Sequence, residues 1–235
     1  MPADDDPPPA PRPPPASLIA SAGAARGWRA WYRRRGATLV DVAVCATLGG
    51  LLIVDARAHW LRHGFDYVQV SFVVQTVIML AMVLARAPQR AIDRDLGHQA
   101  IALAAFASAA LFAEEPATAS AAQHQAAVAI MLVANVVGAI TIVNLGRGFG
   151  ILVALRRIET GGLYRLVRHP MYATDVLLRV GLVLEVTTAR NLVVAAASTA
   201  LYVGRALLEE RFLARDPGYR AYLARVRWRF VPGLW

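Results

Sequence analysis

The sequence predicts an all-α, polytopic membrane protein with about six transmembrane helices and a carboxy-terminal helical hairpin. Of its 235 residues, 57% are hydrophobic and only 17% are charged, and the mean hydropathy is +0.44. Soluble domains carry about 25% charged residues, so a soluble globular enzyme is not expected. Long apolar runs alternate with arginine-rich stretches, which is typical of helical membrane proteins.

The first 24 residues are expected to form a disordered, proline-rich cytoplasmic tail. Eight of the thirteen prolines fall within residues 1–20. Such a density prevents helix propagation, and the segment has too little apolar surface to fold. The alternative function, a proline-rich ligand for a partner domain, rests on composition alone.

Six apolar runs are candidates for membrane spans. A helix needs about 20 residues to cross about 30 Å of hydrocarbon at 1.5 Å per residue. The expected spans are residues 37–54, 67–86, 97–113, 126–145, 174–188 and 191–208. Only the corner Thr188-Ala189-Arg190-Asn191 separates the last two, which predicts a tight antiparallel hairpin.

The placement of arginine predicts the orientation. All 25 basic residues are arginine, and short cytoplasmic flanks carry the excess of positive charge in membrane proteins. With both termini in the cytoplasm, nineteen arginines lie on cytoplasmic flanks, and only Arg57, Arg62 and Arg190 lie outside. Topology therefore explains most of the net charge of +9, and no nucleic-acid partner is expected. The expected location is a bacterial inner membrane.

Three polar residues lie within the expected spans, namely Asp41, Gln75 and Asn135. Such residues bridge helices or line a polar cleft. The sequence leaves both options open.

Two motifs outside the spans are given structural interpretations. Gly146, Gly148 and Gly150 lack the dinucleotide-binding spacing and follow no strand, so we expect a flexible helix end. His59 and His63 have a spacing compatible with metal binding, but an ordinary interface helix is the preferred interpretation, and no metal site is expected.

The candidate chemistry begins after residue 145. Residues 161–172 read GGLYRLVRHPMY. Pro170 biases His169 away from the helical conformation, so a helix should begin directly after Arg168 and His169. Free amide donors at this helix start, together with the two cationic side chains, favour an anionic group such as a carboxylate.

Two acidic residues, Glu209 and Glu210, are predicted at the same membrane level. They lie about forty residues further on, at the end of the returning helix, so the hairpin brings them close to Arg168 and His169. A site with both anion-binding and cation-binding groups suits a zwitterionic, positively charged ligand. The alternative is a solvated acidic pair at a helix end.

The motif residues lie between positions 162 and 232, in the part of the chain from about residue 125 to residue 235. They are Gly162, Tyr164, Arg168, His169, Pro170, Tyr172, Glu209, Glu210, Tyr219, Tyr222, Val226 and Pro232. This pattern resembles the isoprenylcysteine carboxyl methyltransferase family and its phospholipid methyltransferase relatives. The resemblance implies a methyltransferase-like region at 126–235 with a cytoplasmic cofactor pocket, preceded by a scaffold of three spans at 25–125.

The same resemblance implies S-adenosylmethionine as the cofactor and a lipophilic acceptor that enters from the bilayer. The implied cofactor-binding residues are Tyr164, Arg168, His169, Tyr172, Glu209 and Glu210. Of these, the two glutamates would hold the ribose or the methionine ammonium group.

The acceptor stays open between an isoprenylcysteine-like carboxylate, a phospholipid amine and a thiol. A carboxylate is ionised at neutral pH and needs no base, whereas an amine or a thiol needs deprotonation by His169 or Glu209. Arg205 lies one helical turn before Glu209 and is expected to orient an acceptor carboxylate. Arg205 and His169 are therefore the predicted catalytic residues.

Two rival functions are kept. One is a sterol-reductase-like, NADPH-dependent membrane reductase, although such relatives usually carry asparagine at the position of Pro170 and lack the paired glutamates. The other is a non-catalytic membrane protein that retains the fold.

Overall fold

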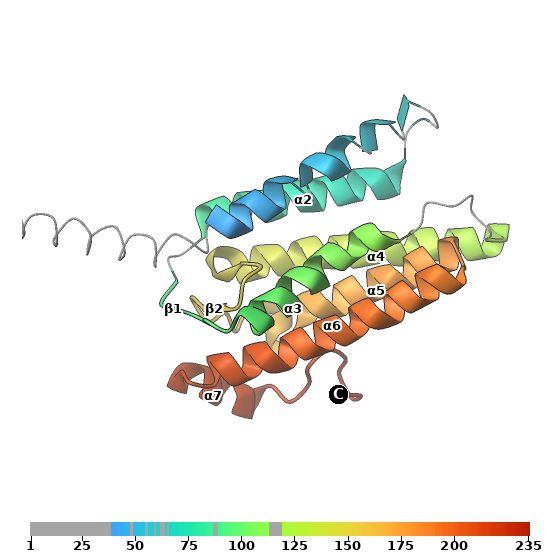
Figure 1. Ribbon diagram of the computed structural model, residues 1–235. Helices are drawn as coiled ribbons and strands as arrows, with labels where there is room; N and C mark the ends of the chain where they lie inside the picture. The colour runs from blue at the N-terminus through green and yellow to red at the C-terminus, as the bar shows by residue number, and fades with distance from the viewer. Residues whose placement is uncertain are drawn as a thin grey trace, which may run out of the picture.

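The computed structural model describes residues 39–235, except residues 48, 55, 59, 62–63, 65, 87–88 and 113–118. The predicted proline-rich tail, as well as His59 and His63, lies outside the described residues. The described helices run side by side along one common direction (Figure 1).

The described elements are mostly helical. The helices are Leu39–Ala58, α2 (Tyr67–Ala85), α3 (Leu96–Ala107), α4 (Ala121–Leu145), α5 (Pro170–Glu185), α6 (Ala189–Leu213) and α7 (Pro217–Arg225). The 3-10 helices are η1 (Ser108–Leu111), η2 (Gly146–Gly148) and η3 (Gly162–Arg165). The strands β1 (Ala91–Ile92) and β2 (Ala154–Leu155) form an antiparallel pair.

Among the described residues, four helices are long and apolar enough to cross a membrane, which makes this an integral, multi-pass membrane protein. They are Leu39–Ala58, Tyr67–Ala85, Ala121–Gly148 and Ala189–Leu213. The prediction of six spans is therefore confirmed for four of them. The apolar helix Leu96–Leu111 and α5 are shorter, and the 16 residues of α5 extend over only about 24 Å.

Capping side chains explain two differences from the predicted boundaries. The helix α4 begins five residues before the expected span because Ser120 and Gln123 form a capping box. The helix α6 begins at Ala189 because the Thr188 hydroxyl accepts from the Asn191 amide at 3.1 Å. The predicted hairpin is confirmed, but its corner therefore lies before Thr188 rather than between Thr188 and Asn191.

Close contacts hold α2, α4, α5 and α6 together. The helix α4 packs against both α2 and α5, and α6 packs against α3 and α5. A Cβ atom at Gly138 of α4 would approach the Gln75 amide to 3.0 Å. Asn135 of α4 donates to the Ser71 hydroxyl of α2 at 2.7 Å. Of the two options for Asn135, the structure shows helix bridging.

The loops are sorted to two ends of the bundle. At one end, β1 after α2 pairs with β2 after α4, and the segment after α6 lies at this same end. We call it the arginine-rich end. At the other end, His124 contacts Glu185 at 2.8 Å, and Arg190 donates to the Leu111 carbonyl at 3.1 Å. This grouping agrees with the predicted alternation of the loops, whereas the side of the membrane stays a prediction.

A buried acid ties the first helix to the arginine-rich end. Asp41 accepts from Arg86, from Arg156 at 3.3 Å and from the Leu152 amide at 3.0 Å. All three charged side chains are at most 4% exposed. Burial, followed by the nearby charge of Arg86, lowers the pKa of Arg156 to about 10. Asp41 therefore bridges the first helix and the loops, which was one of the two roles predicted for it.

We expect Asp41→Asn to lower the free energy of unfolding by about 3–5 kcal/mol, because Arg86 and Arg156 would stay buried without a counter-charge. Denaturant unfolding of the purified chain in micelles measures this. The matched control is Glu185→Gln, which removes an exposed pair and should cost less than about 1 kcal/mol. Equal small effects of both variants would contradict the role of Asp41.

Candidate active site

The helix α5 begins where the sequence predicted. Pro170 is its first residue, and His169 precedes it with φ −128° and ψ 59°. The carboxy-terminal segment lies alongside this start, because the amides of Arg168 and His169 donate to the carbonyls of Trp228 and Arg229, both at 2.8 Å. The Arg-His-Pro segment is thus fixed by main-chain bonds to residues that follow α7.

Glu210 contacts two arginines and one histidine at this point. Its carboxylate lies 3.2 Å from Arg168 Nη1, 3.2 Å from His169 Nε2 and 3.2 Å from Arg229 Nε. The Glu210 side chain is only 9% exposed. It therefore connects α6 to the start of α5 and to the carboxy-terminal segment.

Arg168 extends this connection to α7. Its Nε donates to the Val226 carbonyl at 2.7 Å, and its Nη2 donates to the Leu223 carbonyl at 3.0 Å. With Nη1 on Glu210, each nitrogen of the guanidinium group has a protein acceptor. The contacts of Arg168 are thus structural.

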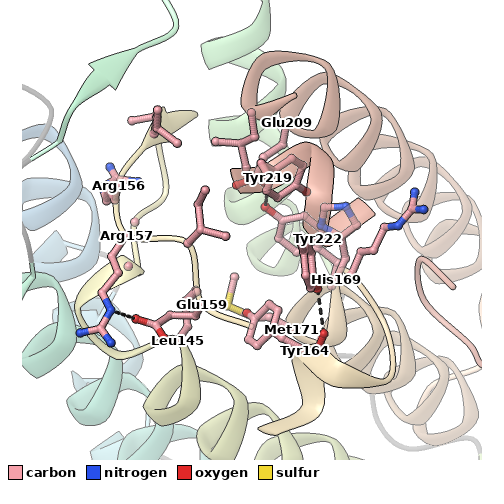
Figure 2. A pocket seen from close by; sticks show the side chains of 18 residues that line it. Leu145, Arg156, Arg157, Glu159, Tyr164, His169, Met171, Glu209, Tyr219 and Tyr222 are labelled. Atoms are coloured by element: carbon pink, nitrogen blue, oxygen red, sulfur yellow. Dashed lines mark hydrogen bonds and ion pairs between the residues drawn. The ribbon is translucent and has the colours of Figure 1, made fainter. Parts of the chain in front are cut away.

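Glu209 has a different environment from its neighbour Glu210. It accepts a hydrogen bond of 2.5 Å from the Tyr172 hydroxyl. No cationic group of the described chain forms an ion pair with Glu209, which lies on the wall of a hollow (Figure 2). Of the two consecutive glutamates, Glu210 therefore contacts basic side chains, whereas Glu209 lies on the wall of the hollow.

The hollow has an empty volume of about 700 Å³, which includes space open to solvent. It is enclosed by the end of α4, the 148–159 loop, η3, α5, α6 and α7. Its lining residues are Leu145, Gly148, Gly150, Ala154, Leu155, Arg156, Arg157, Ile158, Glu159, Tyr164, Arg168, His169, Met171, Tyr172, Glu209, Leu213, Tyr219 and Tyr222. We call it the Glu209 pocket.

Four tyrosines form an aromatic wall of this pocket: Tyr164, Tyr172, Tyr219 and Tyr222. The His169 ring stacks on Tyr172 with a centroid distance of 5.2 Å and an interplanar angle of 6°. The Tyr222 hydroxyl donates to the Tyr164 carbonyl at 2.9 Å. Burial raises the pKa of Tyr164, Tyr219 and Tyr222 above its ordinary value.

The structure places five of the seven predicted site residues in the wall of the Glu209 pocket. They are Tyr164, Arg168, His169, Tyr172 and Glu209. Glu210 lies directly behind the wall, against His169.

Arg205 is the seventh predicted residue, and it lies deeper in the bundle at 3% exposure. Its guanidinium donates to the carbonyls of Ala102, at 3.2 Å, and Ile151. It also lies over the Tyr172 ring, 5.0 Å from the centroid. Its predicted contact with an acceptor carboxylate stays a prediction.

The sequence interpretation missed the 148–159 loop as part of the site. A Cβ at Gly148 would lie 2.9 Å from the Arg157 carbonyl, and one at Gly150 would collide with the Arg156 guanidinium. Arg157 also forms an ion pair of 2.7 Å with Glu159. The glycines therefore permit close packing of the loop on itself. In the sequence, the two glycines followed by two arginines were the feature that could have indicated this loop.

Comparison with known proteins supports the interpretation of the motif. Residues 121–218 match the phospholipid methyltransferase family. The predicted family resemblance is thereby confirmed. The matched phospholipid methyltransferase segment runs from the start of α4 into the first turn of α7, and the family comprises membrane methyltransferases that use S-adenosylmethionine.

Two further comparisons complete this result. No curated protein matches the chain. Among solved structures, the chain is similar to the eukaryotic intramembrane Ras methyltransferase ICMT (isoprenylcysteine carboxyl methyltransferase) at 14% sequence identity and a TM-score of 0.38. The alignment covers 87% of this chain and 96% of that one.

We expect Glu210→Gln to loosen the carboxy-terminal segment and to lower the free energy of unfolding by about 3 kcal/mol, because the partly buried Arg168 and Arg229 lose their counter-charge. Glu209→Gln should cost less than about 1 kcal/mol, because glutamine still accepts from Tyr172. Amide hydrogen exchange over residues 226–235 together with thermal unfolding separates the two variants. Equal effects on both readouts would refute the division of tasks between the glutamates.

We expect Tyr164, Tyr219 and Tyr222 to stay protonated when free tyrosine ionises, at about pH 10. Because their pKa is raised in the folded state, the unfolded chain releases protons first, and stability falls as the pH rises above about 10. Phenolate absorbance of the folded chain measures this. A variant with all three tyrosines changed to phenylalanine should titrate like the wild type up to about pH 10, and a smaller absorbance rise in the variant would contradict the prediction.

Proposed function

We propose that this protein transfers a methyl group from S-adenosylmethionine to a lipophilic acceptor, with the cofactor in the Glu209 pocket. The family match supports methyl transfer. The observation that carries the assignment of the pocket is Glu209, a carboxylate without an ion-pair partner among the described residues, set in an aromatic wall.

The residues of the pocket fit the chemistry of this cofactor. A sulfonium and an ammonium group are cations, for which the Glu209 carboxylate and the faces of Tyr164, Tyr219 and Tyr222 are suitable partners. For the cofactor carboxylate, the start of α5 has no side-chain cap, so the amides of its first turn and the helix dipole favour an anion. The bound cofactor would supply an electrophilic methyl group.

The protein contributes alignment and exclusion of water. An in-line methyl transfer depends chiefly on the geometry of the two reactants, and a pocket walled by tyrosines and leucines reduces solvation of the reacting atoms. His169 supports this by stacking on Tyr172, while its Nε2 is engaged with Glu210.

Glu209 is our candidate for the base when the acceptor is an amine or a thiol. His169 is less suited to this task because its Nε2 already contacts Glu210 at 3.2 Å. The Glu209 carboxylate contacts the neutral Tyr172 hydroxyl instead and can take a proton from an acceptor that reaches the pocket. A carboxylate acceptor would need no base.

We assign Arg205 to the orientation of Tyr172. Its guanidinium lies over the Tyr172 ring and is held by backbone carbonyls of α3 and the 148–159 loop region. These contacts favour support of the pocket wall over a direct contact with an acceptor carboxylate.

The proposed orientation places the Glu209 pocket on the cytoplasmic side, with both termini in the cytoplasm. The pocket opens at the arginine-rich end, and arginine is enriched on cytoplasmic flanks. In this orientation a lipophilic acceptor reaches the pocket from the inner leaflet.

We expect Glu209→Gln to weaken S-adenosylmethionine binding by about tenfold or more, because it removes one charge-assisted contact. Calorimetric titration of the purified full chain in detergent measures the affinity. His169→Ala should also weaken binding, through loss of the stack on Tyr172. Glu185→Gln, at the opposite end of the bundle, is the matched control and should leave affinity unchanged.

Unchanged affinity in both Glu209→Gln and His169→Ala would refute the pocket assignment. A thermal shift with NADPH but none with S-adenosylmethionine would favour the reductase alternative. Incubation of membranes with methyl-labelled cofactor then identifies the acceptor fraction, and cofactor binding without transfer to protein, lipid or thiol would favour the non-catalytic alternative.

A further inference from the structure

We propose that a second hollow at the arginine-rich end binds the phosphate of an anionic phospholipid headgroup through Arg90, Arg94 and Arg215. This inference does not depend on the proposed methyl transfer. It rests on the convergence of these arginines, on the engagement of the acidic groups beside them, and on the position of the hollow at the ends of two membrane spans.

The hollow has an empty volume of about 1390 Å³ and is open to solvent. Arg90 and Arg94 flank the strand β1, whereas Arg215 lies two residues beyond the end of α6. Segments more than a hundred residues apart in the chain thus place three arginines around one space.

The acidic residues beside the hollow are already engaged. Asp93 contacts His98 at 2.7 Å and accepts from the Asp95 amide at 3.1 Å. Asp95 caps α3 by accepting from the amides of Gly97, at 2.8 Å, and His98. Throughout the described chain, no carboxylate forms an ion pair with the side chains of the three arginines, so they are available to an anion.

The charge of Arg215 acts on Asp93. Burial raises the pKa of Asp93, but the hydrogen bond with His98 and the charge of Arg215 lower it below its ordinary value. Asp93 therefore stays ionised, and the three arginines against Asp93 and Asp95 leave the rim with a net charge of +1.

Part of the remaining surface of the hollow is apolar. Ile92, Leu155 and Phe212 contribute to its lining, and the Arg215 guanidinium lies 5.2 Å from the centroid of the Phe212 ring. A free phosphate ion would use only the charged rim. A phospholipid would use both parts, because its phosphate is joined to a glycerol backbone and acyl chains.

The hollow lies at the membrane surface. The candidate spans α2 and α6 end at Ala85 and Leu213, and the arginines follow within a few residues of those ends. Basic pockets at this level are suited to anionic headgroups, to which arginine donates paired, charge-assisted hydrogen bonds.

Topology alone does not explain this arrangement. Arg165, Arg211 and Arg225 are exposed at the same end of the bundle but do not line the hollow. They provide a matched control, because a variant of these three residues removes the same charge from the same end.

The experiment measures retention of phosphatidylglycerol by the purified full chain in detergent, using native mass spectrometry. We expect the variant R90Q/R94Q/R215Q to bind the lipid about tenfold or more weakly, as for loss of at least one charge-assisted contact. The control R165Q/R211Q/R225Q should retain it as the wild type does. The single variant R94Q, at an exposed side chain, should show a smaller loss in the same direction.

The remaining measurements distinguish a phospholipid from a soluble phosphate compound as the ligand. Glycerophosphoglycerol, which has the same phosphodiester headgroup without acyl chains, should bind much more weakly than phosphatidylglycerol, and equal binding would overturn the assignment to a lipid. Equal loss in the control variant would overturn the site, because retention would then follow net charge. Unchanged retention in both R90Q/R94Q/R215Q and R94Q would also overturn it.

Discussion

The Glu210 carboxylate is the contact on which the site depends. Two arginines and one histidine from two separate segments, Arg168 and His169 before α5 and Arg229 after α7, meet on this single acid of α6. A buried acid is stable only when paired and hydrogen-bonded, and here each partner also has a second task. Arg168 donates to carbonyls at the end of α7, and His169 stacks on the ring of Tyr172. The positions of these wall residues therefore depend on Glu210.

This arrangement separates structure from chemistry within two consecutive residues. Successive positions on a helix differ by about 100° in direction, so Glu209 and Glu210 point to different surroundings although they are neighbours in the chain. Glu210, whose carboxylate already has three partners, holds the wall of the pocket in place. Glu209, which has no ion-pair partner among the described residues, lies in the wall of the pocket itself. A pair of glutamates therefore indicates a binding site better than a single acid does, because one glutamate can form the structural contacts while the other stays accessible to a ligand.

The sequence predicted the features that follow from local rules. Pro170 determines where α5 begins, and apolar runs locate α2, α4 and α6. The expected spans 97–113 and 174–188 were already short, as α3 and α5 are, with 12 and 16 residues. The sequence did not predict the role of the loop around Gly148 and Gly150, because that role comes from contacts with Arg156 and Arg157. Arg205 was placed on the correct helix face beside Glu209, but its carbonyl partners at Ala102 and Ile151 are set by tertiary packing that a sequence does not display.

The length of α5 has a consequence for the surrounding lipid. Its 16 residues leave about 6 Å of a typical hydrocarbon core unspanned, and a bilayer meets such a mismatch by thinning locally at a modest cost. Thinning at the amino end of α5 would bring acyl chains nearer to Pro170 and to the mouth of the pocket. A substrate anchored by its hydrocarbon tail would then have less distance to rise, so the membrane itself would contribute to bringing the two reactants together.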